Sequence, residues 1–313
     1  MNKKFLIYPI LTVALGFFAT SCSSDDDDND GPASGTPVDM PIPSSVVDGV
    51  RVSDIQGSAS ISYNADGSIK DATYNGTTYK FEYEGSRAAA STGRKLVRIV
   101  AVDNTFADEG DYEKWEATNF KFNSDGFIVA YYETSEEGRK GDWWERTSFD
   151  ISVDYNNAGR ISTMSISGTY EGYDEDEGKY REKGKAKVKY NYSGDNLISS
   201  IVDDPEGSNS YTFDYSAAPD NTYNIVTPHL GAGMAMYSPI AYIFATAGYL
   251  GNASAQLPTK LTYKYIDKED PEYSETDLYK ISYSLNADNR INSISSTNSG
   301  GGYSTMYFSY ITQ

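Results

Sequence analysis

Cysteine and histidine, common ligands of transition metals, are almost absent from this 313-residue sequence. Cys22 is the only cysteine and His229 the only histidine, so disulfide bonds, cysteine metal sites and zinc sites with two or more histidines are excluded. A Ser-His-Asp triad would have to use His229, but the sequence has no G-x-S-x-G stretch. We expect His229 to be a structural hydrogen-bonding residue, and we predict no catalytic residue, no metal site and no cofactor.

Acidic residues are abundant, with 45 aspartates and glutamates. A glycoside hydrolase needs only two carboxyl groups at a defined separation, and among so many acids the sequence cannot choose a pair. The Asp174–Glu177 run lacks the spacing of a calcium-binding loop. We expect this run, Glu136-Glu137 and Asp203-Asp204 to be solvated.

Two adjacent tryptophans, Trp143 and Trp144, could bind a carbohydrate. They lie among charged residues in the stretch Gly141–Arg146. Exposed aromatic rings stack on the apolar faces of sugars, and nearby carboxylates accept hydrogen bonds from sugar hydroxyls. Adjacent residues of a strand point to opposite faces of the sheet. We therefore expect at least one of the two rings to lie in the core, and we treat both as possible ligand-binding residues.

The charge of the chain limits its partners. The formal charge is −19. An acidic surface repels nucleic acids and anionic lipid head groups, so we expect no nucleic-acid partner, and cations or neutral ligands fit better. The chain also contains 28 tyrosines against 12 phenylalanines and 3 tryptophans. This composition favours strands with one packed face and one solvated face.

The N-terminus has the three-part pattern of a secretory signal peptide. Lys3 and Lys4 precede an apolar run, Phe5–Ala19, which is too short for a comfortable membrane span. The stretch Ala19-Thr20-Ser21-Cys22 resembles a bacterial lipobox, with alanine where leucine is more usual. The resemblance implies that residues 1–21 are removed and that Cys22 is acylated. Acyl chains would then anchor the protein to a membrane.

The residues after Cys22 predict the side of the membrane on which the protein lies. A serine pair followed by acids resembles the surface-export signal of Bacteroidetes lipoproteins, which implies a lipid-anchored outer-membrane protein facing the cell exterior. The alternative is an acidic spacer on a protein retained in the periplasm. We expect residues 22–45 to form a disordered acidic tether. The residues of the export signal are Ser23, Ser24, Asp25, Asp26, Asp27 and Asp28.

A hairpin pattern recurs along residues 46–313, which we predict to form a single β-rich domain. Alternating apolar residues lead into a polar turn in which Asn or Asp starts the turn and Gly or Asn takes the left-handed position, and a second alternation follows, with weaker copies at 190–198 and 283–291. We expect about a dozen strands in an antiparallel meander that forms a curved sheet or a soluble barrel. The clearer copies lie at 61–69, 120–128 and 153–161, and Asn75-Gly76 marks a further tight hairpin.

One segment of the domain departs from the strand pattern. Residues 237–250 are apolar and small, and Pro239 suits the first turn of a helix. Gly248 or Gly251 could end that helix. We expect a buried helix packed on the concave side of the sheet.

These features resemble a family of Bacteroidetes lipoproteins of unknown function that has a porin-like fold. The matching residues are the aromatic hairpins and the stretch Gly248–Lys260 that leads into Leu261–Tyr265. The resemblance covers residues 50–313 and implies a curved antiparallel sheet or barrel. The family offers no assigned catalytic residues to transfer.

The function that follows is a non-enzymatic binding or structural module at the cell surface, with a glycan or a protein as ligand. Two alternatives stay open: a glycoside-active enzyme that uses carboxylates, and an outer-membrane assembly factor. A binding module should present exposed aromatic rings at one open site, whereas a hydrolase should present two neighbouring carboxyl groups.

Overall fold

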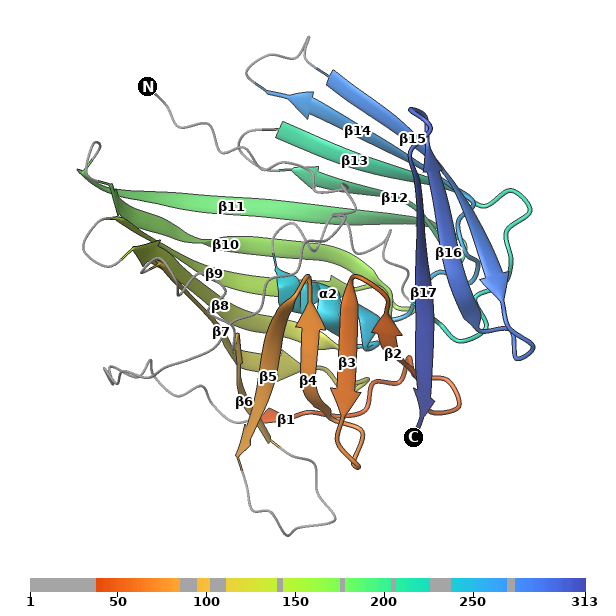
Figure 1. Ribbon diagram of the computed structural model, residues 1–313, viewed down its shortest axis with the longest axis horizontal. Coiled ribbons are helices and arrows are strands. Elements are labelled where there is room, and N and C mark those ends of the chain that lie inside the picture. The colour runs from red at the N-terminus through yellow and green to blue at the C-terminus, as the bar shows by residue number, and fades with distance from the viewer. Residues whose placement is uncertain are drawn as a thin grey trace.

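The computed structural model describes residues 38–84, 95–101, 111–139, 143–174, 178–203, 207–225, 238–268 and 274–313. Within these ranges, sixteen strands, β2 to β17, form a closed antiparallel barrel in which each strand pairs with the next (Figure 1). Pairing of β17 with β2 closes the barrel. The fold is therefore the mainly-β barrel that the sequence predicts, with more strands than the dozen expected.

The strands differ in length around the barrel. Those on one side, β7 to β11, have 12 to 16 residues, whereas β2 to β6 have five to eight. A short additional strand, β1 (Val38–Asp39), pairs with β6. The barrel strands are β2 (Val50–Ile55), β3 (Ala59–Tyr63), β4 (Ile69–Tyr74), β5 (Thr77–Glu84), β6 (Lys95–Ala101), β7 (Asp111–Phe122), β8 (Ile128–Arg139), β9 (Trp143–Tyr155), β10 (Ile161–Asp174), β11 (Gly178–Ser193), β12 (Asn196–Asp203), β13 (Gly207–Asp214), β14 (Lys260–Asp267), β15 (Ser274–Leu285), β16 (Ile291–Asn298) and β17 (Tyr303–Thr312).

Along β9 the wall is apolar inside and polar outside, whereas β12 and β15 carry exposed Ile198, Ile201 and Leu278. Along β9, Ile151 and Val153 are buried inside, while Asp150 and Asp154, which flank this pair, are exposed. A barrel that spans a membrane has the opposite arrangement, with an apolar band on its outer surface. The outer face of β9 therefore differs from that of a lipid-facing strand.

The hairpin turns have the geometry that the recurring sequence pattern predicts. In the β7–β8 turn, Asn123 Oδ1 accepts hydrogen bonds from the backbone N–H groups of Asp125 (3.0 Å) and Phe127 (2.9 Å). The residue three positions after the asparagine is left-handed, with φ of 81° at Gly126 and 60° at Asn289 in the equivalent β15–β16 turn. In these two hairpins, an asparagine that begins the turn and a glycine or asparagine that completes it thus determine the register.

Substitution of Asn123 by alanine should test this turn geometry. We expect Asn123→Ala to lower the free energy of unfolding by about 1–2 kcal/mol. Two backbone N–H groups lose their acceptor, and one of them belongs to the buried residue Phe127. Urea unfolding of the full chain measures the effect. Asp125→Ala, at the exposed tip of the same turn, is the control, and an equal loss in both variants would contradict the assignment.

A single helix among the described residues, α2 (Pro239–Thr246), lies inside the barrel (Figure 1). The sequence predicts this helix, and its first turn does contain Pro239. Ser238 caps the N-terminus by accepting a hydrogen bond from Ala241 N at 3.1 Å. Phe244, on the buried side of the helix, contacts rings on three different strands. None of the described helical residues forms a helix long and apolar enough to cross a membrane.

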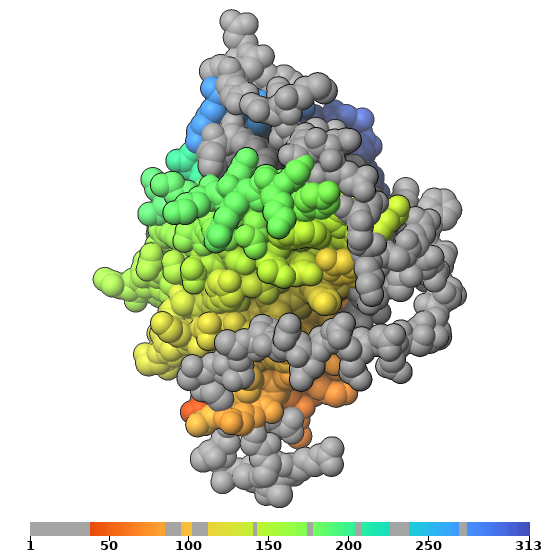
Figure 2. Space-filling model, turned by 90° about the vertical axis from the view of Figure 1, so that its left-hand side faces the viewer, coloured from red at the N-terminus to blue at the C-terminus, as the bar shows by residue number. Residues whose placement is uncertain are grey.

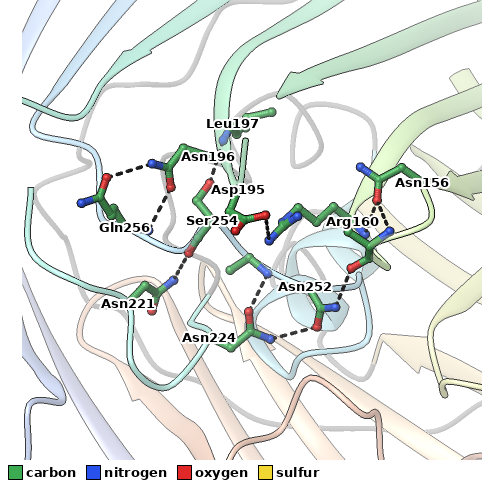
Figure 3. A network of polar contacts seen from close by, with 12 residues as sticks. Asn156, Arg160, Asp195, Asn196, Leu197, Asn221, Asn224, Asn252, Ser254 and Gln256 are labelled. Atoms are coloured by element: carbon green, nitrogen blue, oxygen red, sulfur yellow. Dashed lines mark hydrogen bonds and ion pairs between the residues drawn. The ribbon is translucent and has the colours of Figure 1, made fainter. Parts of the chain in front are cut away.

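The segment after α2 closes one end of the barrel, and we call residues 248–257 the plug. The plug is attached to the surrounding turns by a network of polar contacts (Figure 3). Asn252 Nδ2 donates to Ala158 O at 2.8 Å, and Ser254 Oγ accepts from Leu197 N at 3.0 Å. The helix-to-strand stretch that carries the family resemblance therefore has a structural role, which is to fill the end of the barrel.

Tyrosine hydroxyls support the same end of the barrel from inside the wall. Each donates to a backbone carbonyl at the start of the preceding strand. In these pairs the hydroxyl lies inside the barrel and its partner is the protein backbone, a bond that phenylalanine could not make. The donors and acceptors are Tyr83 to Ile69 O, Tyr155 to Ile128 O, Tyr215 to Leu197 O and Tyr310 to Ile291 O, at 2.5 to 2.9 Å.

Residues that precede the predicted domain boundary at residue 46 also pack against the barrel. Met40 and Ser45 are buried, and Ser45 Oγ donates to Gly248 O at 2.6 Å. Asn224 Nδ2 also donates to the carbonyl of Ser45, at 3.0 Å. Residues 38–45 therefore pack at the plugged end of the barrel. Residues 1–37 lie outside the described part of the chain.

Candidate functional site

The end of the barrel opposite the plug is formed by strands of unequal length. Strand β11 pairs with β10 along residues 178–189, but with β12 only from Lys187 onward. The β10–β11 hairpin therefore projects beyond β12, as Figure 1 shows. We call the inner face of the projecting strands β7 to β11 the mouth. It is defined by Glu113, Glu137, Trp143, Glu145, Tyr170 and Tyr180.

Two stacked tyrosines and a carboxylate lie together in the mouth. The rings of Tyr170 and Tyr180 stack with centroids 5.8 Å apart. The Tyr180 hydroxyl donates to Glu145 Oε2 at 3.2 Å. Gly172 makes room for Tyr180, since a Cβ at Gly172 would lie 2.4 Å from that hydroxyl. Burial and a hydrogen bond to Glu145 raise the pKa of Tyr170, so this phenol stays protonated at neutral pH.

Three glutamates on adjacent strands lie side by side on the same face. Glu113 on β7 is paired with Glu137 on β8, which is paired with Glu145 on β9. Partial burial, followed by the carboxylates of Glu145 and Glu113, raises the pKa of Glu137. Like charges directly opposite each other in a sheet are unfavourable. The sheet tolerates this arrangement at the mouth, where hydroxyls and solvent reach the carboxylates.

The two tryptophans occupy opposite faces of β9, as their adjacency predicts. Trp143 shares the inner face with Glu145, and Trp144 lies on the outer face, where the guanidinium of Arg146 is 6.0 Å from its ring centroid. The expectation that one ring belongs to the core is wrong, because both side chains are half-buried at the end of the barrel and neither contributes to the hydrophobic core. Trp143 thus joins the tyrosines and carboxylates of the mouth, and Trp144 does not.

The other acids singled out by sequence are dispersed. Glu136 faces outward and pairs with Arg146, and its pKa is lowered by that guanidinium against the opposing effect of burial. Asp203 Oδ1 accepts from Lys268 Nζ at 2.7 Å, which lowers the pKa of Asp203. Residues 175–177, Asp204, His229, Cys22 and the export signal 23–28 lie outside the described residues. Among the residues that are described, no three potential ligands are grouped as a metal site.

Deep inside the barrel, one carboxyl group is fully enclosed. Glu133 on β8 accepts hydrogen bonds from Trp115 Nε1 at 2.7 Å and from Ser238 Oγ at 2.6 Å. Burial raises the pKa of Glu133 to about 7, although both hydrogen bonds oppose the shift. Because Glu133 is buried among the helix cap and aromatic rings, it supports the fold and does not contact a ligand at the mouth.

A second charge is enclosed near the plug. Arg51 on β2 is buried, and its Nη1 and Nη2 donate to the carbonyls of Gly67 and Ala247. Its guanidinium also lies 4.0 Å from the ring centroid of Tyr63. The cavity beside Arg51 has a volume of about 20 Å³, enough for one water molecule. We therefore assign Arg51 to the support of α2 and the plug.

The closed barrel, its filled interior and the aromatic mouth can now be compared with known proteins. A porin-like protein from Bacteroides vulgatus ATCC 8482 shares 14% sequence identity, with a TM-score of 0.50 over 84% of this chain and 99% of that chain. The fold is similar to that of a porin-like protein. A second one, from Bacteroides uniformis ATCC 8492, has a TM-score of 0.29 at 14% identity over 66% of this chain and 92% of that chain, and it supports no argument. No family model and no curated protein matches the sequence.

The likeness confirms the porin-like fold expected from the hairpins, at the level of fold alone. The interior of this barrel is packed with α2, the plug and a continuous set of apolar side chains. Sequence reasoning identified the tryptophan pair but missed Tyr170, Tyr180 and the glutamate row. Glu113 and Tyr170 are 57 positions apart in the sequence, and only the successive pairing of β7 to β10 places them on the same face.

Proposed function

We propose that this protein is a lipid-anchored outer-membrane protein at the cell surface and that its barrel is a non-enzymatic binding module with a glycan ligand. The observation that carries the binding role is the mouth, where stacked tyrosine rings adjoin a carboxylate. Aromatic faces stack on sugar rings, and carboxylates accept hydrogen bonds from sugar hydroxyls. The Tyr180 hydroxyl already orients Glu145 for such a contact.

The adjacent tryptophans provide a matched test of the glycan-binding role. The full chain is applied to a glycan array, and Trp143→Ala is compared with Trp144→Ala. We expect Trp143→Ala to weaken glycan binding about tenfold, because a stacking ring contributes on the order of 1 kcal/mol or more. Trp144→Ala, which alters the outer face of the same strand, should bind as the unaltered protein does. Absence of any glycan binding, or equal loss in both variants, would overturn the proposal and leave a protein ligand to be sought.

The anchoring role rests on Cys22 and is tested separately. Replacement of Cys22 by alanine should abolish incorporation of a fatty-acid probe into the protein in growing cells. Undiminished labelling would contradict acylation. Protease treatment of intact cells tests the surface location, and full protection would instead favour retention in the periplasm. If Cys22 is the anchor, the plugged end, where residues 38–45 pack, lies toward the membrane and the mouth points away from it.

A glycoside-active enzyme is the second candidate, and the raised pKa of Glu137 opposite Glu145 favours it. Retaining and inverting glycosidases both use a protonated carboxyl group and a second carboxylate. If the protein is such an enzyme, glycans on the array will be cleaved and Glu137→Gln will abolish product formation. Binding without product supports the binding module.

A further inference from the structure

The outer face of β11 carries a straight row of basic side chains. Outward positions alternate with buried Ala186, Val188 and Tyr190, so every second residue points to solvent. All six outward side chains at these positions are cationic and exposed, although the chain as a whole is strongly acidic. We call this row the basic strip, and it consists of Lys179, Arg181, Lys183, Lys185, Lys187 and Lys189.

The charges of the basic strip are largely uncompensated. Among the described residues, the strip forms one ion pair, in which Arg181 lies 3.6 Å from Glu171 on β10. On β12, Asp203 is paired with Lys187 and is attracted by Lys189, but its ion pair is formed with Lys268 at 2.7 Å. Alternate residues of a strand are about 6.8 Å apart, so the six cations extend over roughly 34 Å. Long side chains in the green of this part of the chain project from the face shown in Figure 2.

Protection of a sheet edge explains only part of the strip. Residues 178–186 of β11 have no partner on the β12 side among the described residues, and lysines on such an edge discourage pairing with other chains. Lys187 and Lys189 continue the row where β11 is paired on both sides. Edge protection does not require cations there.

We propose that the basic strip is a docking site for a linear acidic polysaccharide, separate from the mouth. A single row of charges one strand wide matches a narrow polyanion in shape. On the β10 side, the positions paired with Lys183, Lys185, Lys187 and Lys189 are hydroxyl-bearing residues that can bond sugar oxygens, namely Thr169, Ser167, Ser165 and Thr163.

Two other polyanions fit the surface less well. A flat anionic membrane would also meet the exposed carboxylates of Asp150 and Asp154 on β9, which lies beyond β10. Single-stranded nucleic acid binds where aromatic side chains stack on successive bases, but the strip is flanked by hydroxyl groups for most of its length. A thin, uronate-bearing chain avoids the carboxylates and uses the hydroxyls.

The test compares two variants with the same change in net charge. The strip variant is Lys183→Gln, Lys185→Gln, Lys187→Gln and Lys189→Gln. The control variant neutralises four exposed lysines scattered over the barrel, Lys80, Lys121, Lys264 and Lys280, in the same way. Binding of the purified full chain to polygalacturonate is measured by calorimetry at increasing salt concentration. Neutral dextran, anionic phospholipid vesicles and a single-stranded oligothymidine are measured alongside.

We expect the unaltered protein to bind polygalacturonate with an affinity that falls as salt rises, and the strip variant to bind about tenfold or more weakly. The control variant should change by less than about twofold. Absence of polygalacturonate binding, or equal loss in both variants, would overturn the proposal. Strip-dependent binding of vesicles or oligothymidine in preference to polygalacturonate would overturn it as well. The Trp143→Ala variant should keep full binding to polygalacturonate, so failure of the mouth and failure of the strip are distinguishable.

Discussion

Replacement of Glu133 by glutamine is expected to stabilise the barrel at pH 8 by up to about 3 kcal/mol and to leave its stability unchanged near pH 4. Glutamine resembles the protonated acid in shape and can keep partners at Trp115 and Ser238. Urea unfolding of the full chain at several pH values measures the difference between the variant and the unaltered protein. Only the difference is used, because other acids also contribute to the pH dependence.

The sign follows from the raised pKa of the buried carboxyl. Burial raises the pKa of Glu133 from 4.5 to about 7 in the folded protein. Between these values the folded state holds a proton that the unfolded state has released. The free energy of unfolding contributed by this group therefore falls as pH rises from 4.5 to about 7, and the full penalty is present above that range.

An exposed acid on the next strand serves as the control. Asp150→Asn also removes one negative charge, but from the outer face of the barrel. Its effect should stay within about 0.5 kcal/mol at every pH. A Glu133→Gln effect that is the same at pH 4 and pH 8 would contradict an enclosed, proton-binding carboxyl group.

Replacement of Arg51 by methionine is expected to lower the free energy of unfolding by about 3–5 kcal/mol. The change leaves the carbonyls of Gly67 and Ala247 without their donor inside the barrel. Ala247 is the C-cap of α2, so the helix also loses a positive charge at its negative end. Thermal and urea unfolding of the full chain measure the loss.

Two comparisons make the Arg51 prediction specific. Arg51→Lys keeps the charge but cannot donate to both carbonyls from a planar group, so we expect it to restore less than half of the stability. Arg98→Met removes a guanidinium on a partly exposed side chain that pairs with Glu82 at 2.6 Å, and this should cost less than about 1 kcal/mol. Equal losses at Arg51 and Arg98 would show that enclosure of Arg51 does not determine its contribution.

Local chemistry in the sequence was sufficient to predict the hairpins and the helix. The asparagine that begins each turn, as at Asn123, and the residue that adopts positive φ, as at Gly126, lie within a few positions of each other. Pro239 and the apolar run after it likewise define α2 without reference to distant residues. Such short-range signals gave the fold class and the position of the helix correctly.

Closure of the barrel and the composition of the mouth depend on long-range pairing. Arg51 occupies a strand position that reads as an ordinary solvent-facing arginine, and only the presence of α2 and the plug encloses it. Glu113 on β7 and Glu145 on β9 lie in the same row because each is paired with Glu137 on the intervening strand β8. The basic strip, in contrast, is a local feature of the sequence that was not predicted. Its alternating lysines can be read from the sequence, but the negative net charge of the whole chain gives no indication of a local positive row.

The pairing of β2 with β17 has a consequence for how the polypeptide reaches its native state. Thr312 is paired with Val50, so the ring of hydrogen bonds cannot be completed until the last ten-residue strand has been delivered. Until then both terminal strands expose free backbone donors and acceptors to neighbouring polypeptides. Contacts between such distant residues also form slowly. We therefore expect barrel closure to follow synthesis of β17, and removal of β17 to yield aggregation-prone intermediates rather than a smaller barrel.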